Sequence, residues 1–322
     1  MSNIWKTLPK PFSVLAPMDD VTDLVFREIV CETSKPDLFF TEFANCEALC
    51  SEGKKFQESR LRLTNLQHPI IAQIWGVEPE HFKTVAQHIR SLGFDGIDIN
   101  MGCPIRVVVK NGACAGLIRD RKRAHEIILA TQEGAGYLPV SVKTRIGLNT
   151  IITEDWIGFL LEHHLAAITV HGRTAKEQSK VPNHWDEIGK AVQLRDRVAP
   201  NTIIVGNGDV KTWEEALQIT KVHGVDGVMI GRGIFENMWV FERDQQRTHE
   251  PREIIDLLKK HVALFDHTWG TTKKFDVMKK FFKIYVNGFA GAKEMRADLM
   301  ESKTSDDVLQ KLQAFPQNPT GI

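Results

Sequence analysis

The chain of 322 residues is 42% hydrophobic and 25% charged, and its 41 Lys and Arg balance its 41 Asp and Glu. This composition is typical of globular proteins, and the length suffices for one large domain plus a small one or for two medium ones. Five cysteines without CxxC or Cys/His zinc spacing favour a reducing compartment over disulfides or structural zinc. The N-terminus has no apolar signal region and no run of 18 apolar residues occurs, so we expect a cytoplasmic protein with no membrane span and no metal site.

Short apolar, β-branched runs recur along the first 230 residues and are typical of strands buried on both faces of a parallel sheet. We predict strands at Phe12–Ala16, Asp37–Thr41, Pro69–Ile74, Gly96–Ile99, Val140–Thr144, Ala167–Val170, Thr202–Val205 and Gly227–Ile230. Helical patterns with N-terminal start signals lie between most of them, at Pro79–Leu92, Asp120–Gln132, Thr153–His164, Trp185–Leu194 and Thr212–Val222. This alternation predicts an α/β fold, a (β/α)₈ TIM barrel, with an open doubly wound sheet as the alternative.

The strand pattern stops after about residue 245, and three amphipathic helices are predicted at Glu253–Trp269, Thr272–Asn287 and Ser305–Phe315. We therefore expect a barrel domain over residues 1–245 and a small C-terminal helical domain over residues 246–322. From Pro251 onward the chain carries 12 Lys and Arg against nine Asp and Glu, and Lys273, Lys274, Lys279, Lys280 and Lys283 oppose only Asp276. Such a cluster indicates either a polyanion partner or a solvated helix face.

Polar, charged or glycine-rich residues follow all eight predicted strands, at the end where TIM barrels carry their functional groups. The turns after the last two strands, Gly206–Asp209 and Gly231–Gly233, each lead toward a helix. Glycine lets backbone N–H groups approach an anion, and the helix N-terminus adds a favourable dipole. With Arg232 as a charged partner, these turns predict a phosphate site, although each alone is also an ordinary turn.

Three further side chains are expected beside whatever the phosphate anchors. Lys143 and His171 end neighbouring strands, and Gln73 offers both a donor and an acceptor. An isoalloxazine ring needs such a cation and such an amide, but Lys143 also suits a Schiff base or a structural role. Cys103 follows another strand end, with Asn100 and Gly102 beside it, and is either a reactive thiol or a buried core cysteine.

Taken together, the strand-end motifs resemble the tRNA-dihydrouridine synthases in order and spacing over most of the chain. The motifs are APMDDVTD (16–23), DINMGCP (98–104), VSVKTRIG (140–147), ITVHGRT (168–174), GNGD (206–209) and IGRG (230–233), and NGFAGAKEMR (287–296) resembles the family's RNA-binding end domain. The resemblance implies FMN as prosthetic group, NADPH as reductant and tRNA as substrate. It places FMN against Pro17, Met18, Asp19, Gln73, Lys143, His171, Asn207, Gly208, Asp209, Gly231 and Arg232.

The same resemblance makes Cys103 the catalytic acid, and it makes Asn100, Arg145 and, more weakly, Arg173 the uracil contacts. Lys279, Lys280 and Lys283 would bind tRNA phosphates. Reduced flavin would pass a hydride to C6 of an extruded uridine, and a Cys103 thiol with an ordinary pKa, mostly protonated at neutral pH, would protonate C5.

We expect a monomer. A barrel oxidoreductase acting on a free small molecule and a non-catalytic RNA-binding module remain as alternatives. Two segments depart from the family pattern: Asn111–Gly116, which contains Cys114, and Gln178–Lys180, where many members carry an aromatic residue.

Overall fold

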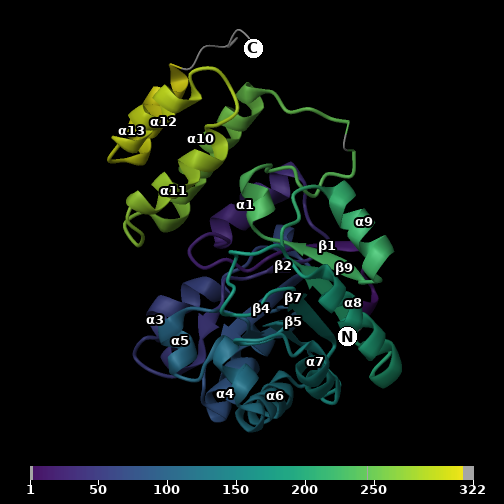
Figure 1. Cartoon of the computed structure of the whole chain (residues 1–322). Coiled ribbons are helices and arrows are strands. Elements are labelled where there is room, and N and C mark those ends of the chain that lie inside the picture. The colour runs from purple at the N-terminus through teal and green to yellow at the C-terminus, as the bar shows by residue number, and fades with distance from the viewer. Residues whose placement is uncertain (1–2, 245, 315–322) are drawn as a thin grey trace.

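The computed structural model describes residues 3–244 and 246–314 (Figure 1). A ring of parallel strands forms its centre, in the order β1-β9-β8-β7-β6-β5-β4-β2. The strands are β1 (Phe12–Leu15), β2 (Phe39–Phe40), β4 (Ile70–Trp75), β5 (Gly96–Met101), β6 (Val140–Arg145), β7 (Ala167–His171), β8 (Ile203–Asn207) and β9 (Gly227–Ile230). A parallel bridge between Val14 and Leu38 joins the two ends of this order. The predicted TIM barrel is therefore confirmed.

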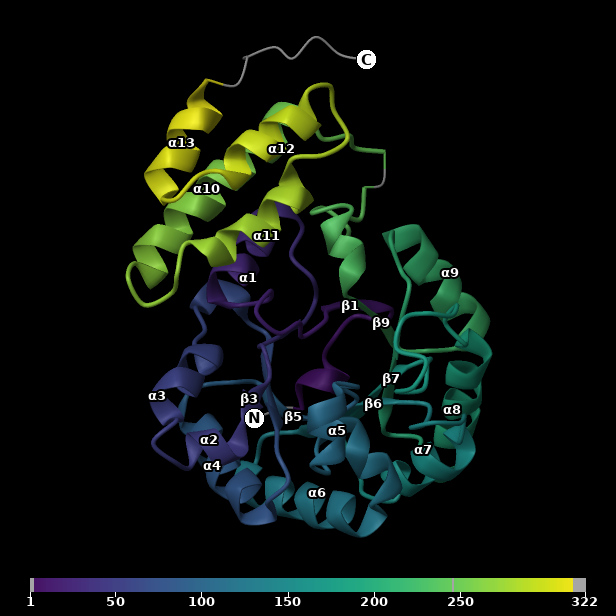
Figure 2. The same cartoon turned by 60° about the vertical axis from the view of Figure 1, so that its left-hand side comes forward.

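Helices cover the outside of the strand ring (Figure 2). They are α4 (Pro79–Ser91), α6 (Arg121–Ala135), α7 (Thr153–Leu161), α8 (Trp185–Val198) and α9 (Trp213–His223). The predicted start signals act locally as expected, because the Asp120 and Thr212 side chains accept hydrogen bonds from backbone N–H groups in the first turns of α6 and α9.

Apolar side chains fill the inside of the barrel at the end opposite to the carboxyl ends of the strands. Trp5, from the short 3₁₀ segment η1 (Ile4–Lys6), is fully buried there, with Phe12 and Phe40 both 6.2 Å from it between ring centroids. A second apolar layer lies between the strands and the surrounding helices. Because these side chains close one end of the barrel, the carboxyl ends of the strands form its open face.

The C-terminal segment folds into helices that lie to one side of the barrel, next to α1 (Leu24–Thr33). They are α10 (Pro251–Trp269), α11 (Asp276–Tyr285), α12 (Ala292–Met300) and α13 (Ser305–Gln313), and α10 packs against α1, α11 and α13. The Asp23 carboxylate, which also caps α1, accepts hydrogen bonds from Trp269 Nε1 at 2.9 Å and from Lys273 Nζ at 2.8 Å. Aromatic stacking between Phe26 and Phe281 supports the same interface.

Several elements differ from the sequence-based expectation. The second strand is shorter than predicted, and the helices α1, α12, α2 (Cys46–Leu49), α3 (Lys54–Gln57) and α5 (Arg106–Lys110), together with strand β3 (Ala44–Asn45), were not expected. Most of these elements are short, and such short elements depend on tertiary packing more than on a regular spacing of apolar residues. The division into residues 1–245 and 246–322 remains a prediction, because residue 245 and residues 315–322, including the predicted helix end at Phe315, lie outside the described residues. No described helix has the length and apolarity to cross a membrane.

Candidate functional site: an anion cradle beside a buried polar chain

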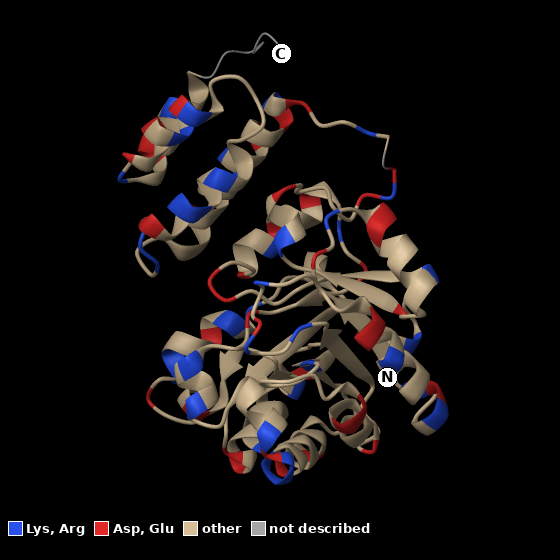
Figure 3. Ribbon diagram, viewed as in Figure 1, with Lys and Arg blue, Asp and Glu red and all other residues tan. Residues whose placement is uncertain are grey.

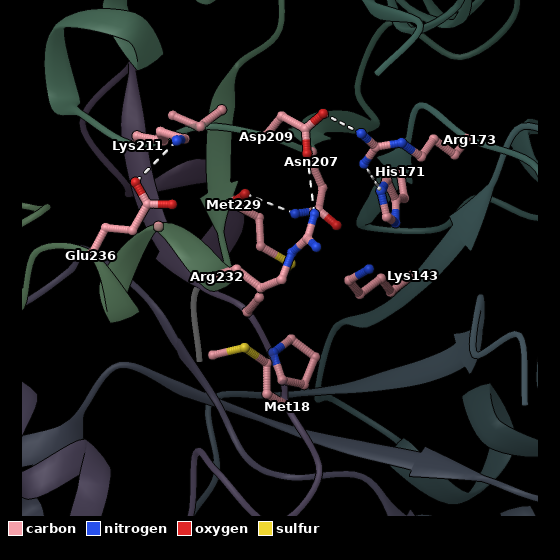
Figure 4. Close-up of a pocket in the computed structure, with 16 residues that line it drawn as sticks. Met18, Lys143, His171, Arg173, Asn207, Asp209, Lys211, Met229, Arg232 and Glu236 are labelled. Atoms are coloured by element: carbon pink, nitrogen blue, oxygen red, sulfur yellow. Dashed lines mark hydrogen bonds and ion pairs between the residues drawn. The ribbon is translucent and has the colours of Figure 1, made fainter. Parts of the chain in front are cut away.

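A cavity of about 450 Å³ opens at the carboxyl ends of β1, β6, β7, β8 and β9 (Figure 4). Most of the predicted cofactor residues line it: Pro17, Met18, Lys143, His171, Asn207, Gly208, Asp209, Gly231 and Arg232. Arg173, predicted to contact substrate, lines it as well. In Figure 4 the side chains of Lys143 and Arg232 extend into the space between Met18 and Asp209.

The turn after β8 has the geometry of an anion cradle. Gly208 adopts a φ of 135°, which an L side chain rarely adopts, and a Cβ there would meet the Asn183 side chain. Within the described chain, the backbone N–H groups of Gly208 and Gly231 donate to no protein acceptor. The amide of Asn183, buried beside Gly208, likewise has no hydrogen-bond partner there. Unused donors in a turn are what an anionic group requires.

Two arginines converge on Asp209 at the edge of this cradle. Arg173 is 2% exposed, forms an ion pair with Asp209 and donates to the carbonyl of Val181 at 2.6 Å. Arg232 is 62% exposed at its side chain and is held to Asp209 only at 3.3 Å. Arg173 is therefore a fixed part of the wall, whereas Arg232 is free to turn toward a bound anion.

Lys143 and His171 have pKa values shifted by their surroundings. Burial, reinforced by Arg145, lowers the pKa of Lys143 to about 8, and burial with the nearby cations lowers the pKa of His171 well below its ordinary value. His171 is therefore neutral at pH 7. Since the Arg173 guanidinium only donates, His171 Nε2 accepts at 3.3 Å and the imidazole proton resides on Nδ1.

Gln73 and Asn100 lie in a buried polar chain behind the cavity. Gln73 Nε2 donates to Asp98 Oδ2 at 2.7 Å, and Gln73 Oε1 accepts from Asn100 Nδ2 at 3.1 Å. Asn100 Oδ1 then accepts the backbone N–H groups of Gly102 and Cys103, both at 3.0 Å. Asp98 lies within the DINMGCP motif, but the sequence analysis did not single it out. The alternation of side chains along a strand predicts only that Asp98 points inward, as its neighbours at i±2 do, and it indicates no partner.

Cys103 is partly exposed, and its thiol interacts with that of Cys114. The hydrogen bond from Cys114 lowers the pKa of Cys103 to about 7 in spite of burial, with Arg145 contributing in the same direction. The ordinary thiol pKa assumed from the sequence is thus too high for this site. Arg145 is held in place by the Gly102 carbonyl at 2.8 Å and by the carbonyls of Thr174 and Gln178 at 3.1 Å.

Asp19, predicted to lie under a cofactor, does not line the cavity. Its carboxylate belongs to a group with Asp20 and Glu42, whose ligand atoms lie within 4.8 Å of one another. The guanidinium of Arg60 contacts all three, at 3.6 Å from Asp20 and 3.0 Å from Glu42. Arg60 thus braces the β1 loop, and it was missed because it lies in a segment without clear periodicity.

The predicted RNA-binding lysines of α11 occupy three different environments, although Figure 3 shows α11 with more Lys and Arg than Asp and Glu. Lys279 pairs with Asp276 at 3.2 Å, and Lys280 donates to the backbone carbonyl of Asp20. Lys283 lines a second cavity of about 560 Å³ between the barrel and the helical segment. Arg232, Arg296 and the ring of Phe281 line it too, so this cavity combines cationic and apolar groups.

A closed parallel barrel whose anion cradle lies at the last strand ends defines a TIM-barrel protein with a site suited to a phosphate group. Among solved structures, two of morphinone reductase in complex with tetrahydroNAD are similar, with TM-scores of 0.52 and 0.51. The first covers 74% of this chain and 88% of its own at 14% identity, and the second, which is of a mutant form, covers 72% and 85% at the same identity. This likeness shows the fold alone.

The family model described as Dihydrouridine synthase (Dus) matches residues 14–320. A protein of Staphylococcus aureus (strain Mu50) named "Probable tRNA-dihydrouridine synthase" is 45% identical over 316 residues, covering 97% of this chain and 95% of its own. "Probable tRNA-dihydrouridine synthase 2" of Bacillus subtilis (strain 168) is 44% identical, covering 97% and 96%. The chain belongs to the dihydrouridine synthase family.

Proposed function

We propose that this chain is a tRNA-dihydrouridine synthase that uses FMN, with NADPH as reductant, to reduce the C5–C6 double bond of particular uridines in tRNA. The observation that carries the proposal is the conjunction of an anion cradle after β8 and β9 with a low-pKa thiol after β5, at the carboxyl ends of strands of one barrel. The family relationship supports the same activity.

The residues at the cradle fit a flavin mononucleotide. The free N–H groups of Gly208 and Gly231, the exposed Arg232 and the unpartnered amide of Asn183 suit its phosphate end. Lys143 supplies a cation for the ring, and the neutral His171 supplies an N–H donor. When bound, FMN supplies the hydride that adds to C6 of the uracil.

Cys103 then supplies the proton to C5. With a pKa of about 7, roughly half of the thiol is protonated at neutral pH, so that the acid is poised close to the working pH. The Cys103 thiolate acts electrostatically on Lys143, which lines the cavity, and this supports a thiol close to the ring-binding part. Because Nε and Nη1 of Arg145 are already committed to backbone carbonyls, its Nη2 is the end that is available to uracil.

Asn100 has a holding role in addition to the uracil contact that the resemblance implies. Its amide is engaged at both ends, toward Gln73 and toward the N–H groups of Gly102 and Cys103. We assign Asn100 to holding the Cys103 backbone in place. The second cavity, with Lys283 and Arg296 at its wall, offers a cationic surface for the tRNA backbone next to the barrel mouth.

The function is tested by incubating the purified, FMN-loaded protein with NADPH and an unmodified tRNA pool, and by mapping dihydrouridine position by position. We expect reduction at defined uridines, with free uracil and simple enones reduced slowly or not at all. Replacing Cys103 by Ala should keep FMN and tRNA binding and lower the rate by about 10²–10⁴-fold, the usual range for a proton donor. Rapid turnover of free substrates with no dihydrouridine in any tRNA would contradict the proposal.

A further inference from the structure

Two cysteines that are 11 residues apart in the sequence lie against each other just beyond the carboxyl end of β5. The backbone N–H of Ala115 donates to the carbonyl of Cys103 at 3.3 Å, so the chain beside Cys114 returns to hydrogen-bond distance of Cys103. The two thiols are themselves hydrogen-bonded, with Cys114 as the donor to Cys103. These contacts bring the pair toward the short separation of α-carbons, about 4.4–6.8 Å, that a disulfide requires.

Both members of this pair are held in place. Asn100 Oδ1 accepts the backbone N–H of Cys103 at 3.0 Å. Cys114 is fully buried at the start of the 3₁₀ segment η4 (Cys114–Arg119), and its φ of 51° lies in the left-handed region, which a residue other than glycine rarely adopts unless its surroundings fix it. The contact between the thiols is therefore a fixed feature of the loop that follows β5, not a chance meeting of two mobile side chains.

Cys103 differs from the other cysteines of the chain, all of which the structure describes. It is partly exposed, and the hydrogen bond from Cys114 lowers its pKa to about 7. Burial raises the pKa of Cys31 to about 11. The pKa values of the other three thiols are raised by burial as well: Cys46, Cys50 and Cys114. Because peroxides oxidise the thiolate and not the thiol, at neutral pH they select Cys103.

We propose that Cys103 is a site of reversible oxidation by hydrogen peroxide and that Cys114 is its resolving thiol. The Cys103 sulfur attacks one peroxide oxygen, the O–O bond breaks, and a sulfenic acid forms, while the released hydroxide takes up the proton that the Cys103 thiol has given up and becomes water. The Cys114 sulfur then attacks the Cys103 sulfur, and its proton leaves with the departing hydroxyl as a second water. Two electrons thus pass from the two thiols to one peroxide molecule, and a Cys103–Cys114 disulfide remains.

The contact between the thiols decides which oxidation state of Cys103 survives. A thiol that already touches the sulfenic acid reacts with it as if it were present at very high concentration. Without a neighbouring thiol, further peroxide turns a sulfenic acid into sulfinic acid, which thiol reductants do not reverse. Cys114 therefore stops the oxidation of Cys103 at a disulfide, which a dithiol reduces.

Trypsin separates the two cysteines, and this gives the direct test. It cleaves after Arg106 and Lys110, so Cys103 lies in the fragment 91–106 and Cys114 in the fragment 111–119. The purified full chain is reduced, freed of reductant, treated with hydrogen peroxide, alkylated and digested without reductant. We expect mass spectrometry to find these two fragments joined and lighter by two hydrogen atoms than their sum. The free thiols, titrated in denaturant, should fall from five to three per chain, and dithiothreitol should restore all five.

Cys114→Ala removes the resolving thiol and leaves four thiols before treatment. With excess peroxide its Cys103 should pass from sulfenic to sulfinic acid, so three thiols should remain even after dithiothreitol. Cys50→Ala is the matched control, because Cys50 is an exposed thiol outside the pair: it should form the same cross-link and recover all four of its thiols. Should Cys114→Ala not fold, Cys114→Ser, which keeps the size of the side chain, takes its place with the same expectation.

Two results would overturn the inference. One is a folded parent protein whose Cys103 stays a thiol or becomes sulfinic acid without any joined fragments. The other is full recovery of the Cys103 thiol by dithiothreitol in Cys114→Ala after the same excess of peroxide.

The oxidation needs neither FMN nor tRNA, so the inference goes beyond the proposed function and is tested apart from it. Under the proposed function the disulfide removes the thiol that protonates C5, so tRNA reduction should fall by about 10²–10⁴-fold on oxidation and return with dithiothreitol. Joined fragments in a protein that reduces no tRNA would leave the inference standing and refute the function. Normal tRNA reduction by a protein that never forms the cross-link would refute the inference alone.

Discussion

Replacing Cys114 by Ala should shift the pH at which the enzyme loses activity on the alkaline side. Cys114 is fully buried, and its thiol hydrogen bond is the largest influence that lowers the pKa of Cys103. Alanine removes this donor while leaving a side chain of modest size in the segment Cys114–Arg119. The pKa of Cys103 should therefore move from about 7 toward its ordinary value of 9.0, since burial then acts with less opposition.

The size of the effect follows from the protonated fraction of an acid. At pH 8, a thiol with a pKa of about 7 is roughly one-eleventh protonated, whereas one that has returned to 9.0 is roughly ten-elevenths protonated. Activity that needs the protonated thiol falls as pH rises through its pKa. The Cys114→Ala enzyme should thus be up to about tenfold faster than the parent at pH 8, and the two should be alike below pH 6.

The assay is the single-turnover rate of tRNA reduction by the prereduced enzyme between pH 5.5 and 9.5. Cys50→Ala serves as the control, because Cys50 is an exposed thiol at the C-terminal end of α2 and its removal should leave the profile in place. An alkaline limb at the same pH in the parent and in Cys114→Ala would refute the role given to this hydrogen bond.

Three further predictions concern the cradle, the domain interface and the RNA surface. Gly208→Ala should weaken FMN binding by at least about tenfold in a fluorescence titration, since the φ of 135° and the Asn183 side chain both exclude a Cβ. Asp23→Asn should destabilise the protein by about 2–3 kcal/mol at pH 7 in denaturant melts, through weakened bonds to Lys273 and Trp269. Although burial raises the pKa of Asp23, Lys273 holds it below 3.8, so this difference should persist above pH 4 and disappear as pH falls below the folded-state pKa. Lys283→Glu should raise KM for tRNA and reduce the salt dependence of tRNA binding by about one ion, with FMN affinity unchanged. The control variant Lys221→Glu, on the outer helix α9, should leave both the KM for tRNA and the salt dependence unchanged.

The sequence by itself determined the architecture and most of the cradle. The repeat of apolar residues in a strand or helix is a local feature of the sequence. Eight apolar runs separated by helical patterns therefore favoured a parallel barrel over an open sheet, and the strand order bears this out. All parallel strands end on the same side, so the residues that follow them must meet, as Lys143, His171 and Arg232 do.

The tertiary structure alone decided the finer chemistry, because it depends on pairs that are distant in the chain and have no periodic signal. Arg60 reaches Asp19 from another segment, and Asp23 meets Lys273 across the interface of barrel and helical segment. The thiol of Cys114 meets Cys103 because the segment between them turns back, and this contact moves an ordinary thiol to a pKa of about 7. The contact of Asp98 with Gln73 likewise comes from the register of two strands, which no spacing within one strand records.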